Sequence, residues 1–417
     1  MKDRTTLCSD DLTLRQTLST FPRNVSILLF FTLLTRLSYF MAWPFLSIIL
    51  TRTYQLTPLT IGSLMSGCAL ISVILGIYGG SLSDRVGRKT LLVLGCLLAI
   101  AGYAGIALAD SIFFFAFGLL LTGISFSWID APSRALMSDL LQDQKRRELA
   151  LQIRYFAVNI AAVSGPLIGI TFGLNSQKGT FLLTALSYVP FLLFSLWSIP
   201  AGKTLPHNNT KAQHDEVMST WQIARLILRD HIYIIVLISS ILCYLVYAQI
   251  ESIVPQYLLT VDATRAVDLV TAILVTNAIT VLIAQFYLVP LLANTPLEQR
   301  IVIGALIFAL SQILFWANDT ANTYWWAGCT VIFSIAEAIL LPNLSILLDR
   351  LAPERYRGAY LGASTLVVLG LSLGPFVGGA LLEWSGKGVF VMMALFCLCI
   401  AALMLINKQK IKLRLRE

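Results

Sequence analysis

The sequence predicts an all-α integral membrane protein whose twelve transmembrane helices form two six-helix bundles. The 417 residues are 57% hydrophobic and only 12% charged, with a mean hydropathy of +0.79, which is not the composition of a soluble domain. Apolar stretches of about 20 residues, each long enough to cross a bilayer, recur along nearly the whole chain. A third observation is an internal repeat at an offset of about 210 residues, which indicates two similar halves.

The apolar stretches give the order of the expected elements. They cover residues 25–50, 60–82, 90–109, 112–136, 148–172, 180–199, 232–257, 266–291, 300–317, 322–347, 358–382 and 388–407. We therefore expect a cytoplasmic N-terminal segment over 1–24, a first bundle over 25–199, a cytoplasmic loop over 200–230, a second bundle over 231–407 and a basic cytoplasmic tail over 408–417. Apolar residues mixed with Arg225 and Arg229 predict a short interfacial helix before the seventh span.

Positive charge is concentrated in the connections on one side of the predicted membrane. These connections and the tail hold most of the lysines and arginines, whereas the other side keeps only Arg52, Lys178, Arg265 and Lys387. This bias places both termini in the cytoplasm and the protein in the inner (plasma) membrane. The basic tail is expected to bind anionic membrane lipid. Because the positive charges lie in the connections between spans, their distribution argues against nucleic acid as a partner.

Small residues and a proline mark two equivalent spans, the fifth and the eleventh. Small residues recur every four positions there, as Ala161, Gly165 and Gly169 beside Pro166, and as Gly370, Gly374 and Gly378 beside Pro375. This spacing lets helices approach closely, and each proline removes one backbone hydrogen bond. A similar correspondence relates Pro132 and Asp139 to Pro342 and Asp349.

A basic hairpin with two glycines connects the second and third spans. Its candidate residues are Gly80, Asp84, Arg85, Gly87, Arg88 and Lys89. The hairpin resembles the loop between helices 2 and 3 of the major facilitator superfamily, which reads G-x-L-x-D-R-x-G-R-[RK]-x-x-L, and every fixed position is filled. The resemblance covers about residues 25–407 and implies the major facilitator fold, with transport by alternating access.

The resemblance also implies roles for single residues. In the family, the hairpin arginine often pairs with an acid on the fourth span, which implies a pair between Arg88 and Asp130 here. The hairpin aspartate faces the start of the eleventh span, so Asp84 is expected near Arg357 as part of a conformational latch. The proline motif of span 5 resembles the antiporter signature of exporters. The stretch from Arg36 onward resembles the first span of proton-coupled drug-efflux members.

Ionisable residues are rare in the spans, so each is a functional candidate. Glu251 shares one face of span 7 with Tyr244 and Tyr247, at spacings of i, i+3 and i+7. Aromatic rings beside a carboxyl group can attract a flat cationic ligand, and the carboxyl group can bind and release protons. Alternatively, Glu251 lies near the outer mouth and is merely hydrated.

Two further charged residues have two open interpretations each. Arg36 lies near the middle of span 1, with Tyr39 and Trp43 one and two turns on, and it either grips a substrate or locks the bundle as an ion pair. Glu337 is either a second proton site or a structural contact. Arg154 is expected to extend to the membrane surface.

The expected function is efflux of amphipathic or cationic small molecules, driven by protons. The alternative is transport of a specific polar metabolite such as a sugar, peptide or siderophore. This alternative needs polar side chains in the cavity, for which Asn159, Gln249, Asn277 and Gln285 are available. No phosphate-binding loop is present, so we expect neither an enzyme nor direct use of ATP. We expect a monomer without a cofactor or metal.

Overall fold

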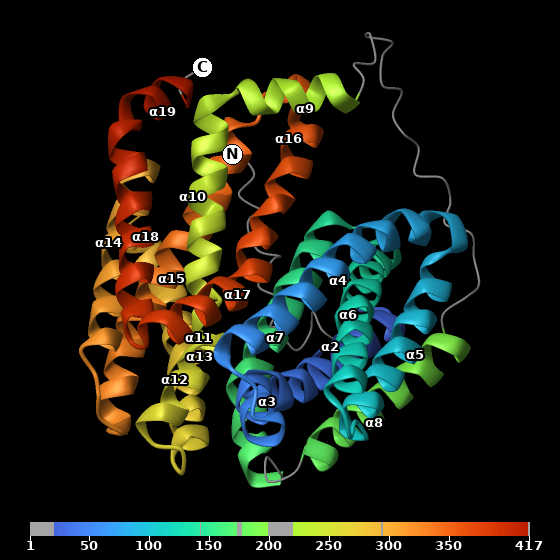
Figure 1. Ribbon diagram of the computed structural model, residues 1–417. Coiled ribbons are helices and arrows are strands. Elements are labelled where there is room, and N and C mark those ends of the chain that lie inside the picture. The colour runs from blue at the N-terminus through green and yellow to red at the C-terminus, as the bar shows by residue number, and fades with distance from the viewer. Residues whose placement is uncertain (1–20, 142, 173–176, 199–219, 293–294, 416–417) are drawn as a thin grey trace, which may run out of the picture.

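The computed structural model describes residues 21–141, 143–172, 177–198, 220–292 and 295–415, which are helical nearly throughout. Twelve helical segments within them are long and apolar enough to cross a membrane, as the sequence predicts. They fall into an N-terminal and a C-terminal group of helices, which Figure 1 shows next to each other.

The first six spans start from Arg23 and include one broken helix. They are α2 (Arg23–Ala42) continuing into α3 (Leu46–Tyr54), α4 (Pro58–Val86), α5 (Arg88–Ala107), α6 (Ile112–Leu140), α7 (Gln144–Phe172) and α8 (Gln177–Trp197). A 3-10 turn over Trp43–Phe45 joins α2 to α3. Pro44 has no N–H to donate, which explains why the α-helix is interrupted there.

The six C-terminal spans include two broken helices. They are α10 (His231–Tyr247) with α11 (Gln249–Ser252) and α12 (Val254–Val261), α13 (Ala266–Leu291), α14 (Leu297–Trp316), α15 (Thr323–Leu351), α16 (Arg357–Ser364) with α17 (Val368–Ser385), and α18 (Gly388–Ile406). The sequence predicts the seventh span as one segment, but the structure divides it into three helices. Pro255 lies in the first turn of α12, where a backbone N–H would have no partner within the helix, so its absence costs least.

Two short helices lie at one end of the molecule, which we call the basic end. The helix α9 (Thr220–Arg229) lies across the end of α10, nearly perpendicular to it, at the top of Figure 1. This is the amphipathic helix that the sequence predicts. The tail forms α19 (Lys408–Arg414), where Ile411 is buried and Arg414 pairs with Asp230 at 2.7 Å.

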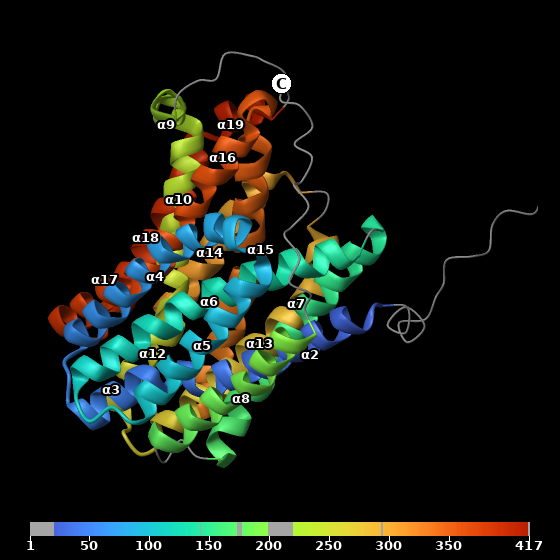
Figure 2. The ribbon, with the colours of Figure 1, turned by 90° about the vertical axis from the view of Figure 1, so that its right-hand side faces the viewer.

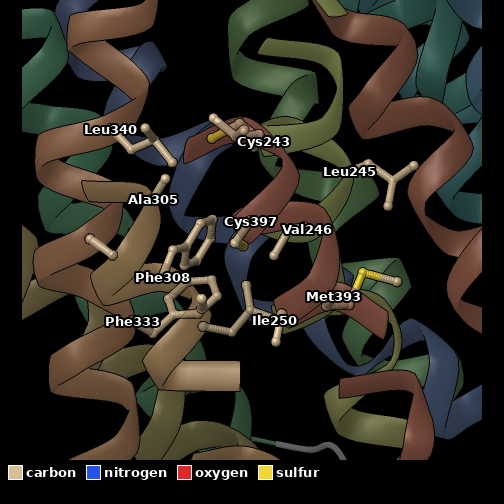
Figure 3. Close-up of a cluster of buried hydrophobic side chains, with 14 of the residues drawn as sticks. Cys243, Leu245, Val246, Ile250, Ala305, Phe308, Phe333, Leu340, Met393 and Cys397 are labelled. Carbon is tan, nitrogen blue, oxygen red and sulfur yellow. The ribbon is translucent and has the colours of Figure 1, made fainter. Parts of the chain in front are cut away.

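Buried apolar side chains form two separate cores. One core takes its residues from Phe21 to Phe194, and rings such as Phe31 and Phe191 stack in it at 4.9 Å. The other extends from Ile227 to Ile411, and among the described residues of the N-terminal half only Phe45 and Ile48 join it. Figure 3 shows part of this second core around Phe308 and Phe333. Each group of six spans therefore buries its own apolar surface.

The two groups meet most extensively where α4 crosses α17, as Figures 1 and 2 show. The hydroxyl oxygen of Ser66 accepts a hydrogen bond from the backbone N–H of Phe376 at 2.9 Å. The backbone N–H of Leu59, at the start of α4, donates to Glu383 at 3.1 Å, where a helix N-terminus favours a carboxylate. These contacts lie toward the end of the molecule opposite the basic end.

The stripes of small residues pack helices within each group. A Cβ atom placed on Gly165 would lie 2.7 Å from Cβ of Phe40, so α7 lies closely against α2. On α17, a Cβ atom on Gly374 would lie 2.5 Å from that of Ala248. Gly169, Gly370 and Gly378 are crowded in the same way. Pro166 and Pro375 both lie inside their helices.

Candidate functional site

Asp130 of α6 lies at the centre of a charge cluster among the N-terminal spans. Its Oδ1 atom lies 2.5 Å from Nη2 of Arg36 on α2, and Arg154 of α7 contacts the same oxygen. Arg134, one turn along α6, lies 3.0 Å from Oδ2. The Arg36 guanidinium also lies 4.0 Å from the ring centre of Phe126. One carboxylate thus holds three spans together.

Two expectations from the sequence are wrong at this cluster. Arg88 pairs with Asp139 at the end of α6, not with Asp130. The two acids are about 14 Å apart along the helix, so only Asp139 is within reach of a side chain at the end of α5. Arg154 does not extend to the membrane surface, because its side chain is only 13% exposed and pairs with Asp130.

The aromatic face that the sequence predicts on span 7 lies beside Glu251. The rings of Tyr244 and Tyr247 on α10 are 6.5 Å apart in an edge-to-face arrangement, and Tyr247 stacks on Phe333 of α15 at 6.3 Å. Glu251 follows on α11, and its carboxyl group is within electrostatic range of the Tyr247 hydroxyl. The groups that helical spacing places on one face therefore stay together although the helix is interrupted after Tyr247.

The carboxyl group of Glu337 on α15 accepts a hydrogen bond from a neutral side chain. Nδ2 of Asn277 on α13 donates to Oε2 of Glu337 at 2.7 Å and to Oγ of Ser334 at 2.9 Å. The sequence places Ser334 one turn before Glu337, but it gives no sign that Asn277 bridges them. Glu337 and Glu251 are within electrostatic range of each other, so both carboxyl groups belong to one site.

Tyr39 connects the two halves of the candidate site. It follows Arg36 by one turn of α2, and its ring stacks on Trp43 at 5.2 Å. Tyr39 is also within electrostatic range of both Arg36 and Glu251. The site therefore has a basic cluster on the N-terminal side, carboxyl groups on the C-terminal side and aromatic rings between them.

The amide side chains available to a polar substrate are bonded within the protein. Nε2 of Gln249 donates to the backbone oxygens of Leu245 and Gly374, at 2.6 and 3.1 Å. Nδ2 of Asn159 donates to a backbone oxygen of its own helix at 3.0 Å. Nε2 of Gln285 on α13 donates to the hydroxyl of Tyr155 on α7 at 2.6 Å, which joins the two halves. Gln249 thus packs span 7 against span 11.

The described part of the hairpin joins α4 to α5 through Gly87. Gly87 has a φ of 92°, a conformation that glycine adopts without strain. Nζ of Lys89 donates to the backbone oxygen of Leu196 at 2.7 Å. Gly80, Asp84 and Arg85 lie outside the residues whose side chains the structure describes. The other half of the expected latch, Arg357, forms an ion pair with Asp349 at 3.0 Å.

Twelve spans in two groups, with ionisable side chains at membrane depth, are the features of a multi-pass membrane transporter. The chain belongs to the Major Facilitator Superfamily, whose family model matches residues 28–368 and, in an overlapping second match, residues 266–414. Members of this family are transporters and not enzymes.

Relatives and solved structures support this membership. The MFS-type transporter YqjV of Bacillus subtilis (strain 168) is 28% identical over 364 residues, 86% of each chain. The multidrug resistance protein MdtH of Escherichia coli O157:H7 is 28% identical over 371 residues, 87% of each chain. A POT family transporter solved in complex with 5-aminolevulinic acid has a TM-score of 0.76 at 17% identity, with 95% of this chain and 100% of the other covered. This last likeness shows the fold alone.

Proposed function

We propose that this protein is a proton-coupled exporter of amphipathic or cationic small molecules and works by alternating access. The observation that carries the proposal is the pair of carboxyl groups Glu251 and Glu337. Within the described part of the chain, neither forms an ion pair, whereas Asp130 contacts three arginines. A carboxyl group without a permanent cation can be protonated and leave no buried positive charge unpaired, which suits it to carry a proton.

The rings around these carboxyl groups support a flat or cationic substrate. Tyr39, Tyr244 and Tyr247 are within electrostatic range of one or both carboxyl groups. A cation over such rings gains cation–π energy and the attraction of a carboxylate. Substrate and proton then compete for the same negative charge, which couples their movements. The name of the relative MdtH, a multidrug resistance protein, agrees with this substrate class.

The orientation that the loop charges favour is consistent with export. With the basic end in the cytoplasm, the contacts of Ser66 and Leu59 with α17 close the outer side. We infer that this arrangement is the state that loads substrate from the cytoplasm or the inner leaflet of the inner membrane. Protons entering from outside then drive the cycle, each supplying about 2.3 kcal/mol per 100 mV of membrane potential.

Transport of a specific polar metabolite is the less favoured function. It requires free hydrogen-bonding groups in the cavity. The amides of Gln249, Asn159, Asn277 and Gln285 all donate to groups of the protein instead. A substrate that replaced these donor contacts would break bonds worth about 1 kcal/mol each, so the amides would serve it mainly through their carbonyl oxygens, of which that of Gln249 has no partner among the described residues.

The test is uptake of a panel of lipophilic cations and neutral drugs into inside-out vesicles with an imposed pH gradient. Wild-type protein is expected to accumulate at least one cation when the lumen is acidic. Glu251→Gln and Glu337→Gln should abolish the accumulation, whereas Glu354→Gln, at an exposed connection, should not. Accumulation that ignores the pH gradient in all four proteins would rule out proton coupling.

A further inference from the structure

The charge cluster of the N-terminal spans holds more positive than negative charge. Arg36 and Arg154 are 14% and 13% exposed, and they share the carboxylate of Asp130, which is 15% exposed. Arg134 is 54% exposed. Even without Arg134, one buried positive charge has no second carboxylate partner among the side chains that the structure describes, which is expensive at membrane depth.

Two buried hydrogen-bonding atoms beside this excess charge have no partner within the described part of the chain. They are Oγ of Ser133 and Nε of Arg154. Ser133 is only 3% exposed. Many buried hydroxyl groups donate to a carbonyl of their own helix, as Ser125 of the same helix donates to Thr122 at 2.7 Å, whereas those of Ser133 and of Ser47 on α3 do not. An unmet buried donor costs about 1–3 kcal/mol, so a bound group is expected here.

A small cavity provides the space for such a group. Its volume is about 20 Å³, and Arg36, Asp130, Ser133 and Arg154 contribute to its lining. This is enough for a water molecule or a monatomic ion and far too small for a drug-sized molecule.

We propose that this cavity binds a small monovalent anion, with chloride as the fitting example. The Ser133 hydroxyl and the Nε–H of Arg154 donate to the ion, and the guanidinium groups of Arg36 and Arg154 attract it. Asp130 opposes binding, but both its oxygens already contact guanidinium groups. The hydroxyls of Thr32 and Thr35, which also line the cavity, donate to backbone oxygens of α2. Chloride therefore offsets the excess positive charge of the buried Arg36 and Arg154 and satisfies both unmet donors, while Arg134 is 54% exposed.

Thermal unfolding of the full chain in detergent tests this proposal independently of transport. Sodium chloride replaces sodium gluconate at constant pH and ionic strength, because gluconate is too large for the cavity. Chloride and bromide should raise the melting temperature of the wild type in a saturable manner. Ser133→Ala should raise the half-saturating chloride concentration about tenfold. Ser125→Ala, whose hydroxyl is bonded within its helix, should leave it unchanged.

Three results would overturn the anion site. Equal melting temperatures of the wild type in chloride and gluconate would mean that water fills the cavity. A chloride response that Ser133→Ala leaves intact would mean that the salt acts elsewhere on the protein. Arg154→Lys is a second variant, which keeps a positive charge but lacks the Nε–H. It should lose the chloride response as well, and a full response from this variant would also contradict the proposal.

Discussion

Nη2 of Arg36 and Oδ1 of Asp130 lie 2.5 Å apart, between the first and fourth spans. Arg154 shares the same carboxylate oxygen, which ties the fifth span to both. The carboxyl groups of the second half, Glu251 and Glu337, have no such ion pairs among the described residues. We therefore infer that the halves differ in role, with fixed charges on one side and exchangeable protons on the other.

Replacing Asp130 with asparagine should destabilise the protein strongly. The change leaves Arg36 and Arg154 buried without a counterion, at a cost of about 3 kcal/mol or more. Asp139→Asn breaks the pair with Arg88, but Asp139 is 48% exposed, so the cost should stay below about 1 kcal/mol. Denaturant titration of both variants in detergent measures the difference. Equal losses would mean that the buried cluster is not structural.

Gly62→Val should reduce transport by preventing close contact between the halves. A Cβ atom on Gly62 would overlap the carbonyl oxygen of Pro375, whereas one on Gly67 of the same helix would meet nothing. We expect a loss of about tenfold in uptake for Gly62→Val and normal uptake for Gly67→Val, at equal expression. If both variants transport normally, the crossing of α4 and α17 is not a required state of the cycle.

Asn277→Ala should impair coupled transport. The change removes the donor to Glu337 and Ser334 and leaves a buried acceptor unmet, at a cost of about 1–3 kcal/mol. Asn343→Ala is the control, because its amide donates to a carbonyl of its own helix. Uptake driven by a pH gradient measures the effect. The same uptake from both variants would show that the orientation of Glu337 does not matter.

The fold is predictable from this sequence because hydropathy alone determines where a helix can cross a bilayer. The predicted range 266–291 coincides with α13, and the face shared by Tyr244, Tyr247 and Glu251 follows from helical spacing. The sequence predicts span 7 as one segment and does not predict its division into three helices, although it contains Pro255, which lies at the start of the third.

The sequence does not predict which side chains pair with each other across helices. Arg154 and Asn277 bond to Asp130 and Glu337 from different spans. No local pattern encodes such pairs, because they depend on how the helices are rotated and packed. The expected pair between Arg88 and Asp130 is wrong for the same reason. Arg88 pairs with Asp139 because that acid lies at the same depth in the membrane as the end of α5.

The proposed latch at the hairpin predicts a kinetic defect. We expect Asp84→Asn to lower the transport rate several-fold at normal expression. When the cytoplasmic side closes, the partial positive charge at the N-terminus of α16 attracts the Asp84 carboxylate, and asparagine lacks the charge that is attracted. Asp143→Asn, at the next basic connection, is the control and should transport normally. An unchanged rate for Asp84→Asn would mean that the hairpin does not act as a gate.

Proton release on substrate binding tests the central claim most directly. Purified protein in weakly buffered detergent solution, with a pH-sensitive dye, receives a lipophilic cation that it transports. The wild type should release protons, and the double variant Glu251→Gln with Glu337→Gln, which binds the cation more weakly, should release none at a cation concentration that saturates it. Release of the same number of protons by the wild type and the double variant would contradict the proposal that these two carboxyl groups couple transport to protons.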